Sequence, residues 1–421
     1  MKFLPLCLLS IFLWTACSSE PPMNADARRL AIADSLAHAY IITDGHVDLP
    51  YRMAVKNFQL VRKYLDNIES TEDGDFDFKR AKEGGLDVPF MSIYIPASYQ
   101  QTGGAKAFAD SLIDMVNSLV DANPDKFGIA GTPQEAEALF AEGKLSLPMG
   151  MENGAPMMDD IANVAYFHER GIRYVTLTHS KDNQICDSSY DTTNTWNGLS
   201  PFGVQIVNEM NRVGTMVDIS HVSDSTFYDV LKIVKAPVIA SHSSCRKYTP
   251  GFERNMNDDM IKMLGENGGV IQINFGSSFL DSAFQAKYDA MQDTVGKWAR
   301  ANKLAYTDSA VIAKAEEYME AAGNPFATVQ IVADHIDNVV ALAGIDHVGL
   351  GSDFDGVGDT LPIGLKDVSD YPNLIAELLK RGYSHEDIEK ICYKNVWRVW
   401  NEVIAVAERS ISNADASAEK S

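Results

Sequence analysis

The sequence has little positive charge, few cysteines, no repeat of fixed period, and no internal hydrophobic run long enough to cross a membrane. Its 36 Lys and Arg face 58 Asp and Glu, which gives a formal net charge of −22. Because this charge would repel a phosphate backbone and no Lys/Arg cluster offers an exception, we expect no nucleic-acid partner. With 421 residues, 46% of them hydrophobic, the chain is long enough to bury a large core. These features predict a soluble globular domain.

The five cysteines are too few for a disulfide framework and do not show a zinc-binding spacing. Cys7 lies within an apolar N-terminal run and Cys17 directly follows it, which leaves three for the folded domain. An odd number permits at most one disulfide there. Whether Cys186 pairs with Cys245 stays open at this point.

The N-terminus is typical of an export signal, because residues 1–16 combine a basic start, an apolar run and two small residues. The run is too short to span a bilayer. Cys17 at its end resembles the lipidated cysteine of bacterial lipoproteins, although Trp14 stands where such signals usually carry Leu. We therefore expect a signal peptide over 1–16, a tether and helix over 17–38, and a lipid anchor at Cys17. This anchor would be the only membrane contact, in the cell envelope on the periplasmic or outer-membrane face. An ordinary secretory signal is the alternative.

Short β-rich runs alternate with amphipathic helical stretches through most of the chain. Helical periodicity is clear at 158–170, 201–212, 223–234 and 257–266. Alternation of this kind implies parallel strands, and eight units close naturally into a barrel. We predict a (β/α)₈ TIM-type barrel over 39–408, with an open doubly wound sheet as the alternative. The eight expected strands are 39–48, 88–95, 145–152, 173–179, 214–221, 237–242, 269–275 and 347–353.

Two long insertions interrupt the alternation, at 50–87 and 276–323. Both follow a strand, so they are expected on the catalytic face of the barrel as walls or lids of a site. The Ser/Ala/Glu-rich segment 409–421 is expected to be a disordered tail.

Polar side chains stand at the carboxyl ends of six of the expected strands, where barrel enzymes assemble their chemistry. Four are histidines and three are carboxylates, and packing alone does not explain them because a buried carboxylate needs a partner. A divalent metal is such a partner. The remaining helical histidines, His38, His168, His335 and His385, are interpreted as having no function. The strand-end residues are His46, Asp48, Glu152, His179, His221, His242 and Asp353.

This set contains imidazole and carboxylate without thiolate, which favours zinc, with manganese or cobalt as alternatives. The number of ligands exceeds what one tetrahedral ion uses, so two ions are expected. Glu152 is central in strand order, and its two carboxylate oxygens make it the natural bridge between them.

Several motifs together resemble the membrane dipeptidases, also called renal dipeptidases, of the amidohydrolase superfamily. The resemblance covers nearly everything from Ala39 to Trp400. It rests on Asp44-Gly45-His46-Val47-Asp48-Leu49-Pro50, Tyr174-Val175-Thr176-Leu177-Thr178-His179, Asp218-Ile219-Ser220-His221-Val222-Ser223, Ser241-His242-Ser243-Ser244, Arg254-Asn255 and Gly351-Ser352-Asp353-Phe354-Asp355-Gly356.

The resemblance implies a zinc-dependent dipeptidase, with dipeptides hydrolysed by a hydroxide that bridges two zinc ions. One zinc would be held by His46 and Asp48, the other by His221 and His242, with Glu152 shared. The resemblance further implies that His179 contacts the substrate and stabilises the oxyanion. Asp353 would handle the proton at the substrate, and Arg254 would hold the free carboxylate of the substrate.

The chain departs from the family pattern at two places in the expected pocket wall. The family's Gly-Gly-His after the bridging Glu reads Asn153-Gly154-Ala155, and its Tyr after Asn274-Phe275 is Gly276. Neither change removes a ligand, so they bear on substrate preference rather than on the metal site.

Some alternatives stay open from sequence. The barrel could serve as a lipoprotein that binds peptides or cell-wall fragments, or catalyse another amidohydrolase reaction. Asp355 competes with Asp353 for the role of base, and Arg254 could pair with Asp258 or Asp259 in the following helix. The sequence does not distinguish a monomer from a homodimer, and it does not define the preferred dipeptide or its stereochemistry.

Overall fold

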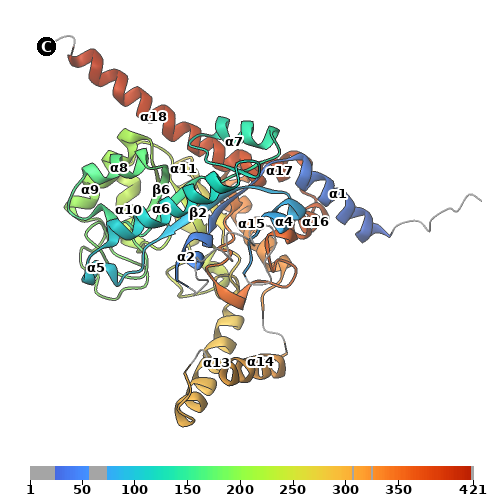
Figure 1. The fold of residues 1–421 in the computed structure, drawn as a ribbon. Helices are drawn as coiled ribbons and strands as arrows, with labels where there is room; N and C mark the ends of the chain where they lie inside the picture. The colour runs from blue at the N-terminus through green and yellow to red at the C-terminus, as the bar shows by residue number, and fades with distance from the viewer. Residues whose placement is uncertain (1–23, 56–73, 306–307, 324–325, 419–421) are drawn as a thin grey trace, which may run out of the picture.

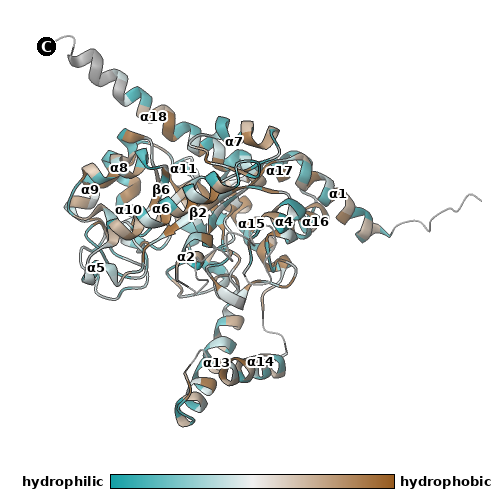
Figure 2. Cartoon of the chain, in the orientation of Figure 1, coloured by the Kyte–Doolittle hydropathy of each residue, from teal (hydrophilic) through white to brown (hydrophobic). Residues whose placement is uncertain are grey.

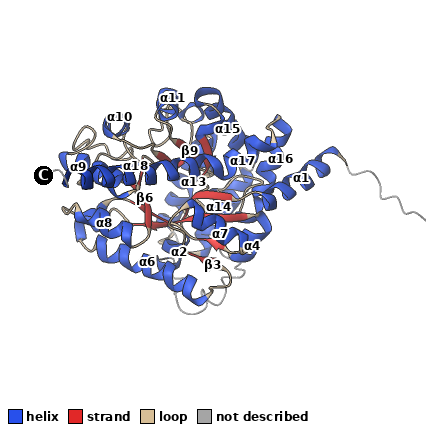
Figure 3. Ribbon diagram, turned by 90° about the horizontal axis from the view of Figure 1, so that it is seen from above, coloured by secondary structure: helices blue, strands red, loops and turns tan. Residues whose placement is uncertain are grey.

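Eight parallel strands form a closed barrel in the computed structural model, which describes residues 24–55, 74–305, 308–323 and 326–418. Figure 3 shows the strands at the centre of the molecule with helices around them. The barrel confirms the predicted fold and excludes an open sheet. Its strands, in spatial order, are β1 (Ile42–Val47), β10 (Val348–Leu350), β9 (Val270–Ile273), β8 (Ile239–Ser243), β7 (Met216–Asp218), β6 (Ile172–Thr176), β5 (Met149–Glu152) and β2 (Leu86–Tyr94).

The barrel strands fall within the eight predicted runs or overlap them, and one predicted run divides in two. Its first part, β4 (Leu145–Ser146), pairs with β3 (Phe127–Gly128) in a separate two-stranded sheet. Only the second part, β5, enters the barrel. Pro148 stands between the two parts, and proline cannot donate a ladder hydrogen bond, so the run is interrupted there.

Helices surround the barrel and follow the predicted alternation. For example, α9 (Pro201–Val213) follows Ser200, whose side chain accepts from the Gly203 N–H, and is followed by Gly214 in the left-handed conformation. Figure 2 shows that the outer helices carry both hydrophilic and hydrophobic residues. The helices around the barrel include α4 (Phe78–Gly84), α5 (Tyr99–Thr102), α6 (Ala105–Ala122), α7 (Pro133–Ala141), α8 (Ala162–Glu169), α10 (Asp224–Ile233), α11 (Asp258–Glu266), α15 (Val329–Ala343), α16 (Tyr371–Arg381) and α17 (His385–Glu389).

The last helix, α18 (Asn395–Ala418), covers the amino-terminal end of the barrel. Trp400 is fully buried 5.2 Å from the ring of Phe90, and Trp397 donates to the Thr43 hydroxyl. They pack with Val88 and Val270, near the strand starts. The helix also runs through residues 409–418, where composition predicts disorder; residues 419–421 lie outside the described part.

The insertion at 276–323 forms α12 (Ser277–Leu280), α13 (Ser282–Ala301) and α14 (Ser309–Ala321). Figure 1 shows α13 and α14 projecting away from the barrel as an arm. The arm has its own small buried cluster, which includes Met291, Val295 and Val311. The other insertion contributes α2 (Leu49–Val55) and α4, while its residues 56–73 lie outside the described part.

At the N-terminus the description begins with α1 (Ala25–Ala39), so the expected signal peptide and Cys17 lie outside the described residues. Among the described helices, none is both long and apolar enough to cross a membrane. Cys186, Cys245 and Cys392 are buried free thiols, so Cys186 and Cys245 are not paired in this structure.

Candidate metal centre

Four side chains from three strand ends gather around the carboxylate of Glu152, which stands at the end of a fourth strand. Its Oε2 lies 3.4 Å from Nε2 of His46, and its Oε1 lies 3.0 Å and 3.2 Å from Nε2 of His221 and His242. Asp48 Oδ2 is 3.5 Å from the same His46 nitrogen. The two oxygens of Glu152 therefore face different histidines, which is the arrangement of a carboxylate between two ligand sets.

Unusual backbone conformations determine the direction of several side chains at this centre. His221, Asp353 and Asp355 have φ of 69°, 64° and 68°, and Asn153, just after Glu152, has φ of 81°. Residues other than glycine seldom adopt this left-handed region, and the cost is accepted where a side chain must be held in place. The strand ends thus turn sharply as they leave the barrel, directing side chains over its mouth.

Hydrogen bonds on the far side of two imidazoles leave Nε2 of each ring directed at the centre. The Tyr174 hydroxyl donates to the Gly45 carbonyl, so at 2.9 Å it accepts from Nδ1 of His46. Ser241 donates to Asp218, so at 2.8 Å its hydroxyl accepts from Nδ1 of His242. Partners of this kind fix the tautomer of metal-ligating histidines.

The charges in the cluster favour binding of a cation. Burial alone would lower the pKa of His46, but Tyr174, Glu152 and Asp48 outweigh it and raise that pKa well above its usual value. Burial would raise the pKa of Glu152, but His46 and its neighbours hold it well below the usual range. Burial lowers the pKa of His242, so that ring is neutral and available as a ligand.

The donor atoms fit a divalent metal. Nε2 of His46 and Oδ1 of Asp48 are buried and have no hydrogen-bond partner in the described structure. Orphaned polar atoms of this kind are costly unless something binds them. Three groups place their ligand atoms within 4.8 Å of one another: His46, Glu152 and His242; Glu152, His179 and His221; and His46, Asp48 and Asp353.

His179 and Asp353 lie beside the proposed ligands. Nε2 of His179 is 3.7 Å from Glu152 Oε1, and its ring centroid is 4.2 Å from that of His221. Burial raises the pKa of Asp353 to about 7, and its Oδ2 accepts at 2.8 Å from the amide of Asn274. Both residues therefore border the space where a substrate would meet the metals.

Asp355, the competing candidate for the base, is engaged elsewhere. Its Oδ1 accepts from Arg52, in a buried ion pair, and from the Asp75 N–H at 2.7 Å. Gly356 explains how the neighbouring carboxylates fit, because a Cβ there would lie 2.2 Å from both Asp353 Oδ1 and Asp48 Oδ2. The turn after β10 therefore favours Asp353 over Asp355 for chemistry at the centre.

Arg254 is buried and directed at the strand that carries His242. It donates to the Ser243 hydroxyl and to the His242 carbonyl, each at 2.7 Å, and its Nε has no partner in the described structure. The helical carboxylate Asp259 pairs with Lys262 at 3.0 Å. The described ion pairs thus do not show the alternative role for Arg254, pairing with α11.

A cavity of about 520 Å³ opens above the centre. The first part of the arm closes one side of it. At the departure from the family pattern, Phe279 forms part of the wall: a Cβ on Gly276 would lie 2.9 Å from Phe279 and from Val357, so a side chain there requires both neighbours to shift. The lining includes Tyr51, Tyr94, Glu152, His179, Tyr190, His221, Phe279, Phe284, Gln285, Tyr288 and Asp353.

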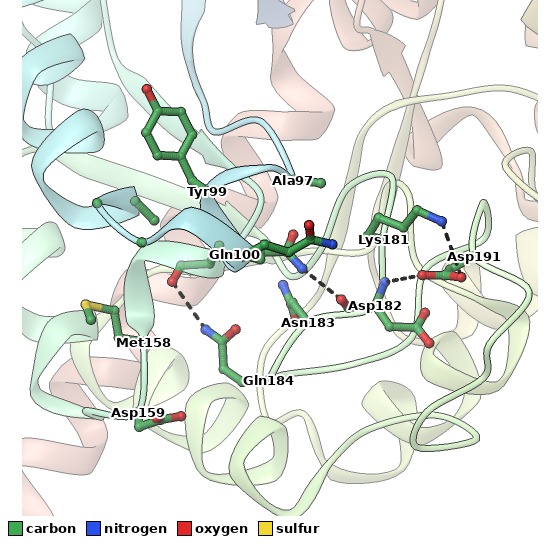
Figure 4. Close-up of a pocket in the computed structure, with 15 residues that line it drawn as sticks. Ala97, Tyr99, Gln100, Met158, Asp159, Lys181, Asp182, Asn183, Gln184 and Asp191 are labelled. Carbon is green, nitrogen blue, oxygen red and sulfur yellow. Dashed lines mark hydrogen bonds and ion pairs between the residues drawn. The ribbon is translucent and has the colours of Figure 1, made fainter.

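A second cavity, of about 540 Å³, lies behind the loop that follows β6. Figure 4 shows Gln100 bonded to the Asp182 carbonyl and Lys181 paired with Asp191 along its lining. Ala155, the other departure from the family pattern, faces this cavity. The change at Ala155 therefore alters a space beside the catalytic pocket.

The predicted site residues come together, but the residues that support them were missed in the sequence. Tyr174 stands two residues into an apolar strand, and a tyrosine there could have signalled a buried hydroxyl partner. Asp218 precedes His221 by three residues and binds the backbone N–H groups of Ser220 and Ser241. The role of Asn274 could not be predicted, because the sequence pattern does not show its contact with Asp353 at the end of a neighbouring strand.

Comparison with known proteins places the chain in a family. A family model described as membrane dipeptidase, peptidase family M19, matches residues 30–414. The chain belongs to the membrane dipeptidase family. This confirms the resemblance seen in the sequence, and as a member of that family the protein is a metallo-dipeptidase, a peptide hydrolase.

Individual relatives of the membrane dipeptidase agree. It is 34% identical over 377 residues to the dipeptidase verJ of Clonostachys rogersoniana, covering 87% of this chain and 85% of that one. It is 33% identical over 382 residues to an uncharacterized dipeptidase of Schizosaccharomyces pombe, covering 88% and 82%. The crystal structure of the probable dipeptidase PvdM from Pseudomonas aeruginosa is 26% identical with a TM-score of 0.75, covering 90% of this chain and 99% of that one.

Proposed function

We propose that this membrane dipeptidase hydrolyses dipeptides at a site for two zinc ions. The observation that carries the proposal is that the two carboxylate oxygens of Glu152 face different histidines. Its Oε2 faces His46, and its Oε1 faces His221 and His242. One ion would be held by His46 and Asp48, and the other by His221 and His242. Imidazole and carboxylate donors without thiolate favour zinc.

When bound, two zinc ions lower the pKa of a water and polarise the carbonyl of the scissile bond. The protein residues then act around that bond. Asp353, buried and held by Asn274, accepts the proton of the attacking water and passes it to the leaving amine. His179, beside Glu152, donates to the oxygen that becomes negative in the transition state.

Arg254 would bind the free carboxylate of the substrate. Its Nε lacks a partner, and a guanidinium matches a carboxylate with two parallel hydrogen bonds. Recognition of this end would restrict cleavage to short peptides, because a longer substrate carries an amide at the same place. The preferred side chains of the dipeptide are a separate question.

The location of the protein is a further part of the proposal. The N-terminal sequence supports export followed by lipid attachment at Cys17, which would leave the catalytic domain on the envelope with no other membrane contact. A Cys17→Ser variant should then move from the membrane fraction to the soluble fraction and lose labelling by a fatty-acid probe. Unchanged membrane association would contradict the anchor.

The metal site is tested by measuring metal content and activity together. Exhaustive chelation should abolish dipeptide hydrolysis, and adding zinc should restore it in proportion to occupancy up to two equivalents per chain. A purified enzyme that is fully active with one equivalent, and gains nothing from more, would rule out the binuclear reading. Absence of dipeptide hydrolysis with two equivalents bound would rule out the substrate assignment.

A further inference from the structure

Tyr190 stands in the loop between β6 and α9 and lines the catalytic cavity together with Glu152, His221 and Asp353. It exposes 41% of its surface. Its ring centroid lies 5.9 Å from that of His221 and 6.0 Å from that of Phe252. The ring therefore borders the metal centre without being buried in the core.

The backbone around Tyr190 is anchored to two strand ends of the site. The Ser189 N–H donates to the His221 carbonyl at 2.8 Å, and Ser188 forms an antiparallel bridge with Val222. The Ser188 hydroxyl donates to the His179 carbonyl and accepts from the Tyr190 N–H. This loop is thus held against both histidine-bearing segments, so the backbone that carries the phenol is fixed relative to the centre.

The Tyr190 hydroxyl makes no hydrogen bond within the described chain, and the residue lines the cavity. Desolvation raises the pKa of Tyr190 to about 12, and the positive charge of Arg254 opposes that rise. Rings connect them as well: Phe252 contacts Phe279 at 5.7 Å, and the Arg254 guanidinium lies 5.3 Å from the Phe279 ring centre.

A phenol oxygen can accept from a guanidinium, but the phenol O–H then still needs an acceptor elsewhere, because arginine has none. Each residue thus offers a donor, the Nε of Arg254 without a partner in the described chain and the hydroxyl of Tyr190, and one anionic group bound at the centre could accept from both. We infer that Tyr190 is a substrate-binding residue, whose hydroxyl donates to the carboxylate of the dipeptide alongside Arg254. This inference rests on the proposed function and adds a specificity determinant to it.

The inference is tested with the zinc-loaded enzyme, using a dipeptide analogue with a reduced peptide bond and the C-terminal amide of that analogue as competitive inhibitors. Tyr190→Phe should raise the inhibition constant of the analogue with the free carboxylate roughly tenfold or more, as expected for losing a hydrogen bond to a charged group. Binding of the amide should weaken clearly less, by about two- to fivefold at most, because a hydrogen bond to a neutral group contributes less free energy than one to a charged group. Tyr228→Phe, on α10 and half-buried, is the matched control and should change neither.

An Arg254→Ala background provides the second measurement. If both donors hold one carboxylate, the Tyr190→Phe effect on the acid should shrink there, since coupled residues are not additive. Equal losses for acid and amide, no loss for the acid, or full additivity with Arg254→Ala would each overturn the inference. A parent enzyme that hydrolyses dipeptides would keep the proposed function intact in all three cases.

Discussion

Glu152 and Asp353 are both buried carboxylates at strand ends, yet their surroundings assign them different roles. Glu152 faces three histidines with both oxygens, whereas Asp353 accepts from Asn274 and shares a group only with His46 and Asp48. Glu152→Gln should therefore reduce metal affinity by about tenfold or more, because an amide nitrogen cannot bind a cation. Asp353→Asn should keep the metal and lower kcat about a hundredfold or more, through loss of the base.

Metal content by mass spectrometry, measured beside kcat on zinc-loaded protein, separates the two variants. Loss of both metals in Asp353→Asn, with turnover recovered when zinc is resupplied, would mean that the two roles are exchanged. The exposed Asp121→Asn is a suitable control for the change of charge.

At this scale the sequence predicted the residues of the centre because each follows an apolar run, and parallel strands bring their carboxyl ends to one edge. It could not predict the partners that orient them. Tyr174 reaches His46 across the barrel, a contact between residues more than a hundred positions apart. The left-handed backbone conformation of His221 and Asp353 could not be predicted either. Glycine is the residue type that usually indicates this conformation, and neither residue is glycine.

At the scale of secondary-structure elements, a buried acidic residue lies where β1 pairs with β2. Asp87 accepts from the Ile42 N–H, and burial raises its pKa to about 6, while Lys82 at 3.6 Å opposes the shift. The raised value means that the folded chain binds the proton more tightly than the unfolded chain. Stability should therefore fall as pH rises from about 4 to about 6, and the cost persists at neutral pH.

Asp87→Asn should remove this cost while keeping an oxygen for Ile42. At pH 7 the variant is expected to gain on the order of 1–3 kcal/mol in the free energy of unfolding, with the gain vanishing below about pH 4. Urea unfolding of variant and parent across this range gives the difference directly. A variant less stable than the parent at pH 7 would show that the charged form of Asp87 is favourable.

The elements also show where periodicity stops being informative. Alternating runs located the barrel strands, but the break at Pro148 separates β4 from β5 within one apolar stretch. The tail composition suggested disorder, yet α18 extends to Ala418, with the helix-favouring Ala414, Ala416 and Ala418 in its last turns. The projecting α13–α14 arm could be located as an insertion, but its helical fold rests on a local cluster that the barrel pattern does not contain.

For the whole molecule, metal and fold should be linked, since the ligands come from strands around the barrel. An ion that binds only the folded chain stabilises it by an amount that grows with concentration, about 4 kcal/mol at a thousand times Kd. Chelation should therefore lower Tm in calorimetry, and zinc should raise it again. A Tm that is the same with and without metal would show that the centre contributes nothing to stability.

The point at which the barrel closes during synthesis affects which metal ion the protein binds in the cell. β1, which carries His46 and leads to Asp48, pairs on one side with β10, so the closed barrel that holds the ligands is complete only after residue 350 has been synthesised. Nitrogen and oxygen ligands bind copper more tightly than zinc, so such a centre does not choose its ion by affinity alone. Metal identity is then decided by supply at the place and moment of folding. The same sequence produced in two cellular compartments should contain two different metal complements.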